Sequence, residues 1–155
     1  METSAERELR AYVDLHEVGA DILSFSPNII LEAPVKLLNS GKTPARDVFA
    51  LGNIDILPYP PPSPFPNTFP EQDVSRFTMA AGRRADSTIA AHRLFSAQEL
   101  ADVRRGTNLR MYGYGLITYI DVFGKHRRTT FRFMYGGSGD AKNTFIACPE
   151  GNSVE

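Results

Sequence analysis

The last third of the chain carries the pattern that most restricts its fold, two long alternating segments joined by a short turn. Residues 109–122 precede the turn Phe123-Gly124-Lys125, and residues 128–135 follow it. The second segment has one largely aromatic face and one polar face, with Thr129, Phe131, Phe133 and Tyr135 on the first and Arg128, Thr130 and Arg132 on the other. Side chains alternate across a strand with a period of two. The sequence therefore predicts a long antiparallel hairpin with one face in the core.

Shorter segments upstream extend this β prediction. We expect further strands over residues 9–15, 29–38, 47–57, 76–79, 87–95 and 144–147. The run Ser96-Ala97-Gln98-Glu99 is a capping box and Gly106 is a typical left-handed stop, so residues 97–105 are expected to form one short helix. About seven short strands with turns between them and one helix predict an all-β, immunoglobulin-like, two-sheet antiparallel sandwich.

The chain has 155 residues, the length of one ordinary domain that buries a core without metals or disulfides. We therefore expect a single β-sandwich domain over residues 1–155, with a flexible tail at about residues 148–155. Seven prolines fall at positions 58, 60, 61, 62, 64, 66 and 70. Because proline lacks the backbone donor that a central strand needs, residues 58–70 are expected to form a stiff surface crossover loop. Docking of its P-x-x-P motifs into an aromatic groove is the less favoured alternative.

Composition and motifs argue against several classes of function. The lone Cys148 excludes an intramolecular disulfide and a cysteine-based zinc site. No apolar run approaches the ~20 residues that span a bilayer, and residues 1–10 lack the apolar stretch of a secretory signal. The chain has no G-x-S-x-G motif, no histidine pair at helical spacing and no phosphate loop. We therefore assign no catalytic residue, metal or cofactor, and a hydrolytic enzyme is the least favoured function.

The first strand of the predicted hairpin has an unusually apolar second face. If Ile117 and Tyr119 face the core, the opposite face carries apolar and aromatic side chains where a solvated strand is normally polar. We expect this face to be covered by the proline-rich loop, by the helix or by another subunit. The candidate interaction surface consists of Tyr112, Tyr114, Leu116, Ile120, Val122, Phe65 and Phe69.

Basic residues are concentrated in the second half of the chain. Residues 76–142 contain 12 Lys and Arg against 5 Asp and Glu, although the net charge of the whole chain is −1. The candidate basic patch is Lys125, Arg127 and Arg128. A nucleic-acid or anionic-lipid partner is not favoured, because no recognition motif accompanies the patch and the isoelectric point is near 6.3.

Two titratable residues flank the hairpin turn. Asp121 and His126 could form an ion pair that titrates near neutral pH. The favoured interpretation is that the Asp121 carboxylate accepts amides of the turn while His126 is solvated.

Four segments resemble one group of proteins. NSGKTPARDV at residues 39–48 resembles its "N-x-G-x-T-P-A-x-D-V" turn, and YGLITYIDVFG at residues 114–124, followed by Thr130-Phe131, resembles its "Y-G-x-I-x-Y-x-D-x-F-G … T-x-F" hairpin. AERELRAYV at residues 5–13 is similar to the start of its soluble domain, and CPEGN at residues 148–152 is similar to its end. The group consists of uncharacterised bacterial proteins, many with one or two transmembrane helices before an immunoglobulin-like domain.

The resemblance implies a sandwich that is often tethered outside the cytoplasm, and it implies no activity. This chain starts near the domain boundary with no membrane helix, and it has Phe131-Arg132-Phe133 where many relatives have a second cysteine. No compartment is therefore assigned. We predict a non-catalytic binding or assembly module that acts through a protein partner or self-association. The alternative is a structural subunit of a larger envelope or virion assembly.

Overall fold

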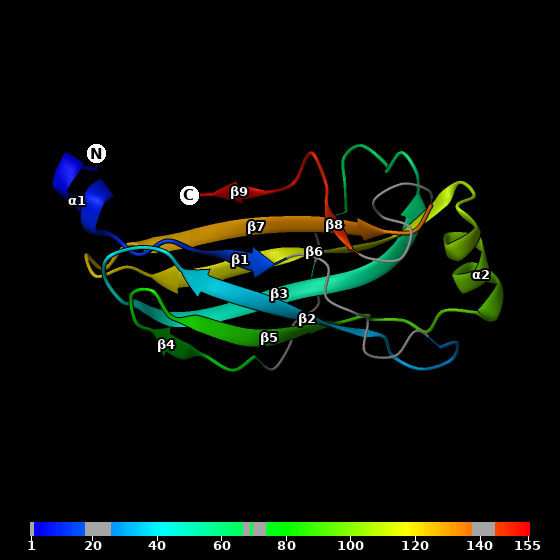
Figure 1. The fold of residues 1–155 in the computed structure, drawn as a ribbon, viewed down its shortest axis with the longest axis horizontal. Coiled ribbons are helices and arrows are strands. Elements are labelled where there is room, and N and C mark those ends of the chain that lie inside the picture. The colour runs from blue at the N-terminus through cyan, green and yellow to red at the C-terminus, as the bar shows by residue number, and fades with distance from the viewer. Residues whose placement is uncertain (1, 18–25, 67–68, 70–73, 138–144) are drawn as a thin grey trace.

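The protein is mostly β, with two antiparallel sheets and two short helices (Figure 1). This computed structural model describes residues 2–17, 26–66, 69, 74–137 and 145–155. Strands account for 47% of the described residues and helices for 11%. These values confirm the all-β class and the two antiparallel sheets predicted from the sequence.

The smaller sheet has three strands in the order β1-β2-β5. Their bounds are Val13–Glu17 for β1, Glu32–Asn39 for β2 and Arg84–Ala90 for β5. Pro34 lies in the central strand, opposite Thr88 of β5, whereas β1 pairs with β2 only from Lys36 onward. Pro34 thus lies outside the described pairing of β2 with β1, which suits a residue that has no backbone donor.

The larger sheet has six strands, in the order β4-β3-β6-β7-β8, and β9 also pairs with β7. The bounds are Ala45–Pro58 for β3, Phe77–Met79 for β4, Leu109–Ile120 for β6, His126–Tyr135 for β7, Ile146–Ala147 for β8 and Ser153–Val154 for β9. The hairpin of β6 and β7 runs in unbroken register from Met111↔Tyr135 to Ile120↔His126. The alternating pattern of this segment therefore predicted both its pairing and its faces.

One hydrophobic core lies between the two sheets. Buried side chains of the smaller sheet meet buried side chains of the larger one, among them Val35, Leu37 and Ile89 on one side and Ile54, Ile117 and Phe131 on the other. Gly113 faces this core without a side chain because a Cβ there would lie 2.2 Å from the ring of Phe133. The aromatic face predicted for the return strand is accordingly the core face, with Phe131 and Phe133 stacked at 6.0 Å.

The first predicted strand is wrong over its first half. Residues Ser4–Leu9 form helix α1, and β1 begins only at Val13. The Thr3 side chain accepts from the amide of Glu6, and the Glu6 carboxylate accepts from the amide of Thr3. This capping box stabilises α1, which overlaps the predicted strand at Leu9, and residues 10–12 belong to neither a helix nor a strand.

Helix α2, Ala97–Arg105, lies where the sequence predicted it. Ser96 and Glu99 form the expected capping box, and Gly106 ends the helix in the left-handed region with φ 73. Leu100 and Val103 are its buried residues. The protein therefore has two short helices rather than the single helix that was predicted. No helix within the described ranges has the length and hydropathy needed to cross a bilayer.

The predicted crossover loop and tail differ in how well they match the structure. Residues 58–66 and Phe69 of the loop are described, while its residues 67, 68 and 70 lie outside the described part of the chain. The strand predicted over residues 144–147 contains β8, which pairs with β7. The tail at about residues 148–155 was expected to be flexible, but it returns along the edge of β7 and forms β9 there (Figure 1).

Candidate functional site

The outer face of β6 is covered at one end by the proline-rich loop. Tyr112 and Tyr114 are only 1% and 3% exposed. The ring of Phe65 meets them edge-on, with centroids 5.6 Å and 4.9 Å away, and the ring of Phe69 lies 5.8 Å from that of Tyr114. Of the three covers considered from the sequence, the loop is the one that lies over these two tyrosines.

The other end of the same face is half-exposed and apolar. Leu116 and Ile120 of β6 are half-buried, and so are Phe49 and Leu51 of the neighbouring strand β3. Leu51 stands directly opposite Leu116 in the pairing, so the two share this face. We call Phe49, Leu51, Leu116 and Ile120 the apolar band. Val122, which was predicted to extend it, lies past the end of β6 in the hairpin turn and is 51% exposed.

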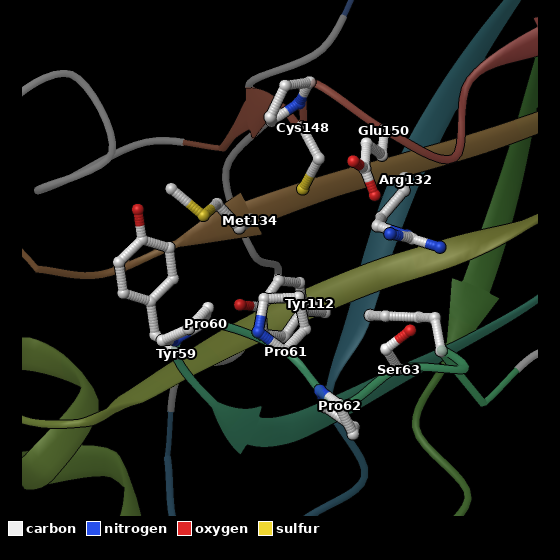
Figure 2. A pocket seen from close by; sticks show the side chains of 12 residues that line it. Tyr59, Pro60, Pro61, Pro62, Ser63, Tyr112, Arg132, Met134, Cys148 and Glu150 are labelled. Atoms are coloured by element: carbon white, nitrogen blue, oxygen red, sulfur yellow. The ribbon is translucent and has the colours of Figure 1, made fainter.

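A groove lies beside the covered tyrosines, between the proline-rich loop and the C-terminal tail (Figure 2). Residues 59–63 with Phe65 form one wall, and residues 148–150 form the other. The floor consists of Tyr112, Arg132 and Met134 on strands β6 and β7. The volume of this proline groove is about 400 Å³, within the range of roughly 300–1,000 Å³ that is usual for ligand pockets.

Among the described residues that line the proline groove, Arg132 alone is cationic. Its guanidinium carbon lies 3.6 Å from the centre of the Phe65 ring, which is a close cation–π contact. Within the described part of the chain, no carboxylate lies within 4.0 Å of this guanidinium and no acceptor receives a hydrogen bond from it.

The two other titratable groups near the floor are held neutral by burial. Burial raises the pKa of the Tyr112 hydroxyl to about 12 and the pKa of the Cys148 thiol to about 11. The Cys148 thiol points toward the floor from the tail (Figure 2). Because a nucleophilic cysteine needs a lowered pKa, Cys148 has the environment of an unreactive thiol.

At the hairpin turn, Asp121 accepts backbone amides as expected. Its carboxylate receives the amides of Phe123 and Lys125, both at 2.9 Å. The ion-pair partner is Arg127, whose Nε lies 2.9 Å from Asp121 Oδ2. His126, the partner considered from the sequence, is exposed. The Asp121 carboxylate therefore closes the turn through backbone amides and forms its ion pair with Arg127, the residue that follows His126.

The candidate basic patch is largely neutralised by carboxylates. Arg127 contacts Glu2 at 3.3 Å in addition to Asp121. The Lys125 ammonium lies 3.6 Å from Glu6 of α1, and Arg128 lies 3.5 Å from Glu155 of the tail. These pairs give the patch a structural role in holding both ends of the chain against the hairpin.

No three His, Cys, Asp or Glu side chains among the described residues are placed to share a metal ion.

The sequence reasoning missed two residues that matter most to these surfaces. Arg132 was assigned only to a polar strand face, and Glu2 was assigned nothing. The sequence did contain a signal for Arg132. Its neighbours Phe131 and Phe133 were predicted to face the core, so alternation places the long side chain of Arg132 on the outer face of the sheet, where it can lie across neighbouring residues. The role of Glu2 depends on where α1 docks, and nothing local in the sequence indicates that.

Comparison of the chain with known protein families, with curated proteins and with solved structures finds no match.

Proposed function

We propose that this protein is a non-catalytic binding or assembly module of immunoglobulin-like topology that contacts a protein partner, or a second copy of itself, through the apolar band. The observation that carries the proposal is that Leu116 and Ile120 are only half-buried on a sheet face whose other end lies under Phe65 of the proline-rich loop. The resemblance to immunoglobulin-like domains of bacterial proteins belongs to the same proposal.

The surroundings of the band support a protein contact. An antiparallel sheet with one face in the core normally shows polar side chains on the other face. Here the apolar side chains span two neighbouring strands, and the exposed residues Arg46, His126 and Arg128 border them in the same strand pairing. An apolar centre with a polar, charged rim is the usual composition of a protein–protein interface.

The test substitutes the band with charge. We expect Leu116→Asp and Ile120→Asp each to lower the mass measured by light scattering at high protein concentration. We also expect Leu116→Asp to abolish crosslinks from a photoreactive residue at position 120 in the native host. The matched control is Leu94→Asp, because Leu94 is 51% exposed and lies just before α2. A wild-type protein that stays monomeric and crosslinks no better from position 120 than from position 94 contradicts the proposal.

A further inference from the structure

The proline groove has the chemical character of a site for a small apolar molecule. Its walls and floor are mostly hydrocarbon, from the side chains of Pro60, Pro61, Pro62, Phe65 and Met134. Pockets of this size that are lined by apolar and aromatic side chains, with a few polar groups among them, are the usual sites of small ligands. The polar groups then determine which ligand is accepted.

Arg132 is the strongest polar group in the groove, and its position is fixed from two sides. The Phe65 ring stacks on one side of the guanidinium at 3.6 Å. The tail backbone lies against it at Gly151, where a Cβ would come within 2.5 Å of Arg132 Nε. A cation that is already held in place loses little conformational entropy when it binds an anion.

The donors of this guanidinium are available to a ligand. Aromatic stacking engages the face of a guanidinium and leaves the in-plane N–H groups unused. Among the described residues no carboxylate forms an ion pair with Arg132, although Arg127 and Arg128 on the same strand each have one. A planar guanidinium with free N–H groups is the preferred partner of a carboxylate, which it binds through two parallel hydrogen bonds.

Tyr112 is a second donor at the floor. Its hydroxyl lies 3.5 Å from the carbonyl oxygen of Pro58, at the long limit of a hydrogen bond. The hydroxyl is therefore free to turn toward a ligand oxygen. Glu150 is the only acidic residue of the lining; it is exposed on the tail wall, and no ion pair joins it to Arg132.

We propose that the proline groove binds a small apolar carboxylic acid, with the carboxylate on the guanidinium of Arg132 and the hydrocarbon body against the proline wall and Met134. One guanidinium matches one carboxylate in charge and in geometry, whereas a phosphate group usually recruits several cations or backbone amides. This site is separate from the apolar band, so it does not depend on the proposed function.

The first experiment needs no variant. The full chain is titrated with 3-phenylpropanoate and with the neutral alcohol of the same shape, 3-phenylpropan-1-ol, by calorimetry and by NMR. We expect the acid to bind at least about tenfold more tightly than the alcohol, since a charge-assisted pair typically contributes that much. Cys148, the single cysteine of the chain, lines the groove, and its raised pKa makes its alkylation slow. At alkaline pH, where a fraction of the thiol ionises, we also expect the acid to slow this alkylation further.

Variants then assign the preference to Arg132. Arg132→Gln is expected to bind acid and alcohol equally, Arg132→Lys to keep part of the preference, and Glu150→Gln to bind the acid more tightly than wild type. Arg128→Gln is the matched control, because Arg128 lies on the same strand outside the lining. Circular dichroism checks the fold of each variant.

The proposal is overturned if the alcohol binds as tightly as the acid, if neither compound binds at about 10 mM, or if folded Arg132→Gln keeps the preference. Protection of Cys148 by the alcohol alone also overturns it. Since the comparison of acid with alcohol uses the wild-type chain, an unstable variant leaves the test intact.

Discussion

The Nε atom of Arg127 donates to Oδ2 of Asp121 at 2.9 Å, and the Asp121 side chain is fully buried under the hairpin of β6 and β7. The same guanidinium contacts Glu2, which also lies 3.3 Å from Arg10. Through these contacts one buried carboxylate connects the hairpin turn to the segment around α1. The Asp121–Arg127 pair thus connects the hairpin turn, in the last third of the chain, to the N-terminal segment that carries Glu2.

We predict that Asp121→Asn lowers the free energy of unfolding by about 2–4 kcal/mol. The asparagine oxygen still accepts turn amides, but the buried ion pair with Arg127 is lost. Urea denaturation measures the change. The control is Arg128→Gln, whose pair with Glu155 is exposed and is expected to contribute less than about 1 kcal/mol. Equal effects of the two substitutions would show that Asp121 has no special role.

The same carboxylate gives the stability a defined dependence on pH. Burial on its own raises the pKa of Asp121, but the amide of Lys125 and the guanidinium of Arg127 outweigh it and hold the pKa below its ordinary value. A lowered pKa in the folded state contributes stability above the unfolded value of about 3.9, and that contribution is lost as the pH falls through the folded pKa.

We therefore predict that the melting temperature of the wild type falls as the pH is lowered below about 4, and that Asp121→Asn removes part of this fall. Melting curves between neutral and acidic pH measure both proteins. Asp102→Asn serves as the comparison, because Asp102 also has a lowered pKa, from a hydrogen bond with Arg105, but its side chain is half-buried whereas that of Asp121 is fully buried. A profile for Asp121→Asn that parallels the wild type would refute the assignment.

The fold was predictable where the signal is local and periodic. The alternation along residues 128–135 placed Phe131 and Phe133 in the core, and the capping box at Ser96 placed α2. The strand predicted over residues 9–15 begins only at Val13, because α1 ends at Leu9 and residues 10–12 belong to neither element. The capping box at Thr3 that starts α1 was visible in the sequence, and it was not used in the prediction.

The candidate site was predictable only in part, because its contacts join distant segments. The apolar parity of β6 indicated a covered face, and Phe65 was named as a cover for it. The sequence could not indicate that Phe65 stacks on Arg132, or that the tail forms the second wall of the proline groove. Such contacts depend on the path that the proline-rich loop and the tail follow. The length of a loop limits how far it can reach, but it does not determine where its residues lie.

Phe65 provides a test of how much the loop cover stabilises the fold. We predict that Phe65→Ala costs about 2 kcal/mol, because it removes edge contacts with Tyr112 and Tyr114 and the stack on Arg132. Denaturation combined with near-ultraviolet circular dichroism of the tyrosines reports the loss. Phe123→Ala in the hairpin turn, where Phe123 is 41% exposed, should cost less than about 1 kcal/mol. Similar costs for the two would mean that the loop does not hold this face.

The cap of α2 allows a smaller and independent prediction. Ser96→Ala should cost about 1 kcal/mol, since the Ser96 hydroxyl accepts the amide of Glu99 at 3.1 Å. The matched change Gln98→Ala removes only the exposed side-chain contact with Asp102 and should cost less than about 0.5 kcal/mol. Thermal denaturation distinguishes the two. A cost for Ser96→Ala no larger than that for Gln98→Ala would contradict the role of the cap.

The last prediction concerns the edge of β7, which the tail covers in an unusual way. Between β8 and β9, the side-chain amide of Asn152 takes the place of a strand residue: its oxygen accepts the amide of Arg132 at 2.9 Å, and its nitrogen donates to the carbonyl of Arg132 at 3.2 Å. The same nitrogen donates to the carbonyl of Cys148 at 2.9 Å, which closes the tail on itself. An uncovered strand edge is a template for pairing with other chains, so Asn152 protects the sheet from aggregation.

We predict that Asn152→Ala increases the exchange rate of the Arg132 amide hydrogen and makes the protein aggregate at lower concentration, with little change at amides in the centre of β6. Hydrogen exchange by NMR and light scattering measure the two effects. Asn152→Asp separates the contributions, because its carboxylate still accepts the amide of Arg132 but no longer donates to the carbonyls. It should keep the Arg132 amide protected while loosening the tail at Cys148. If Asn152→Ala leaves that amide as protected as in the wild type, the edge is held by the pairing of β8 and β9 alone, and the side chain has no part in covering it.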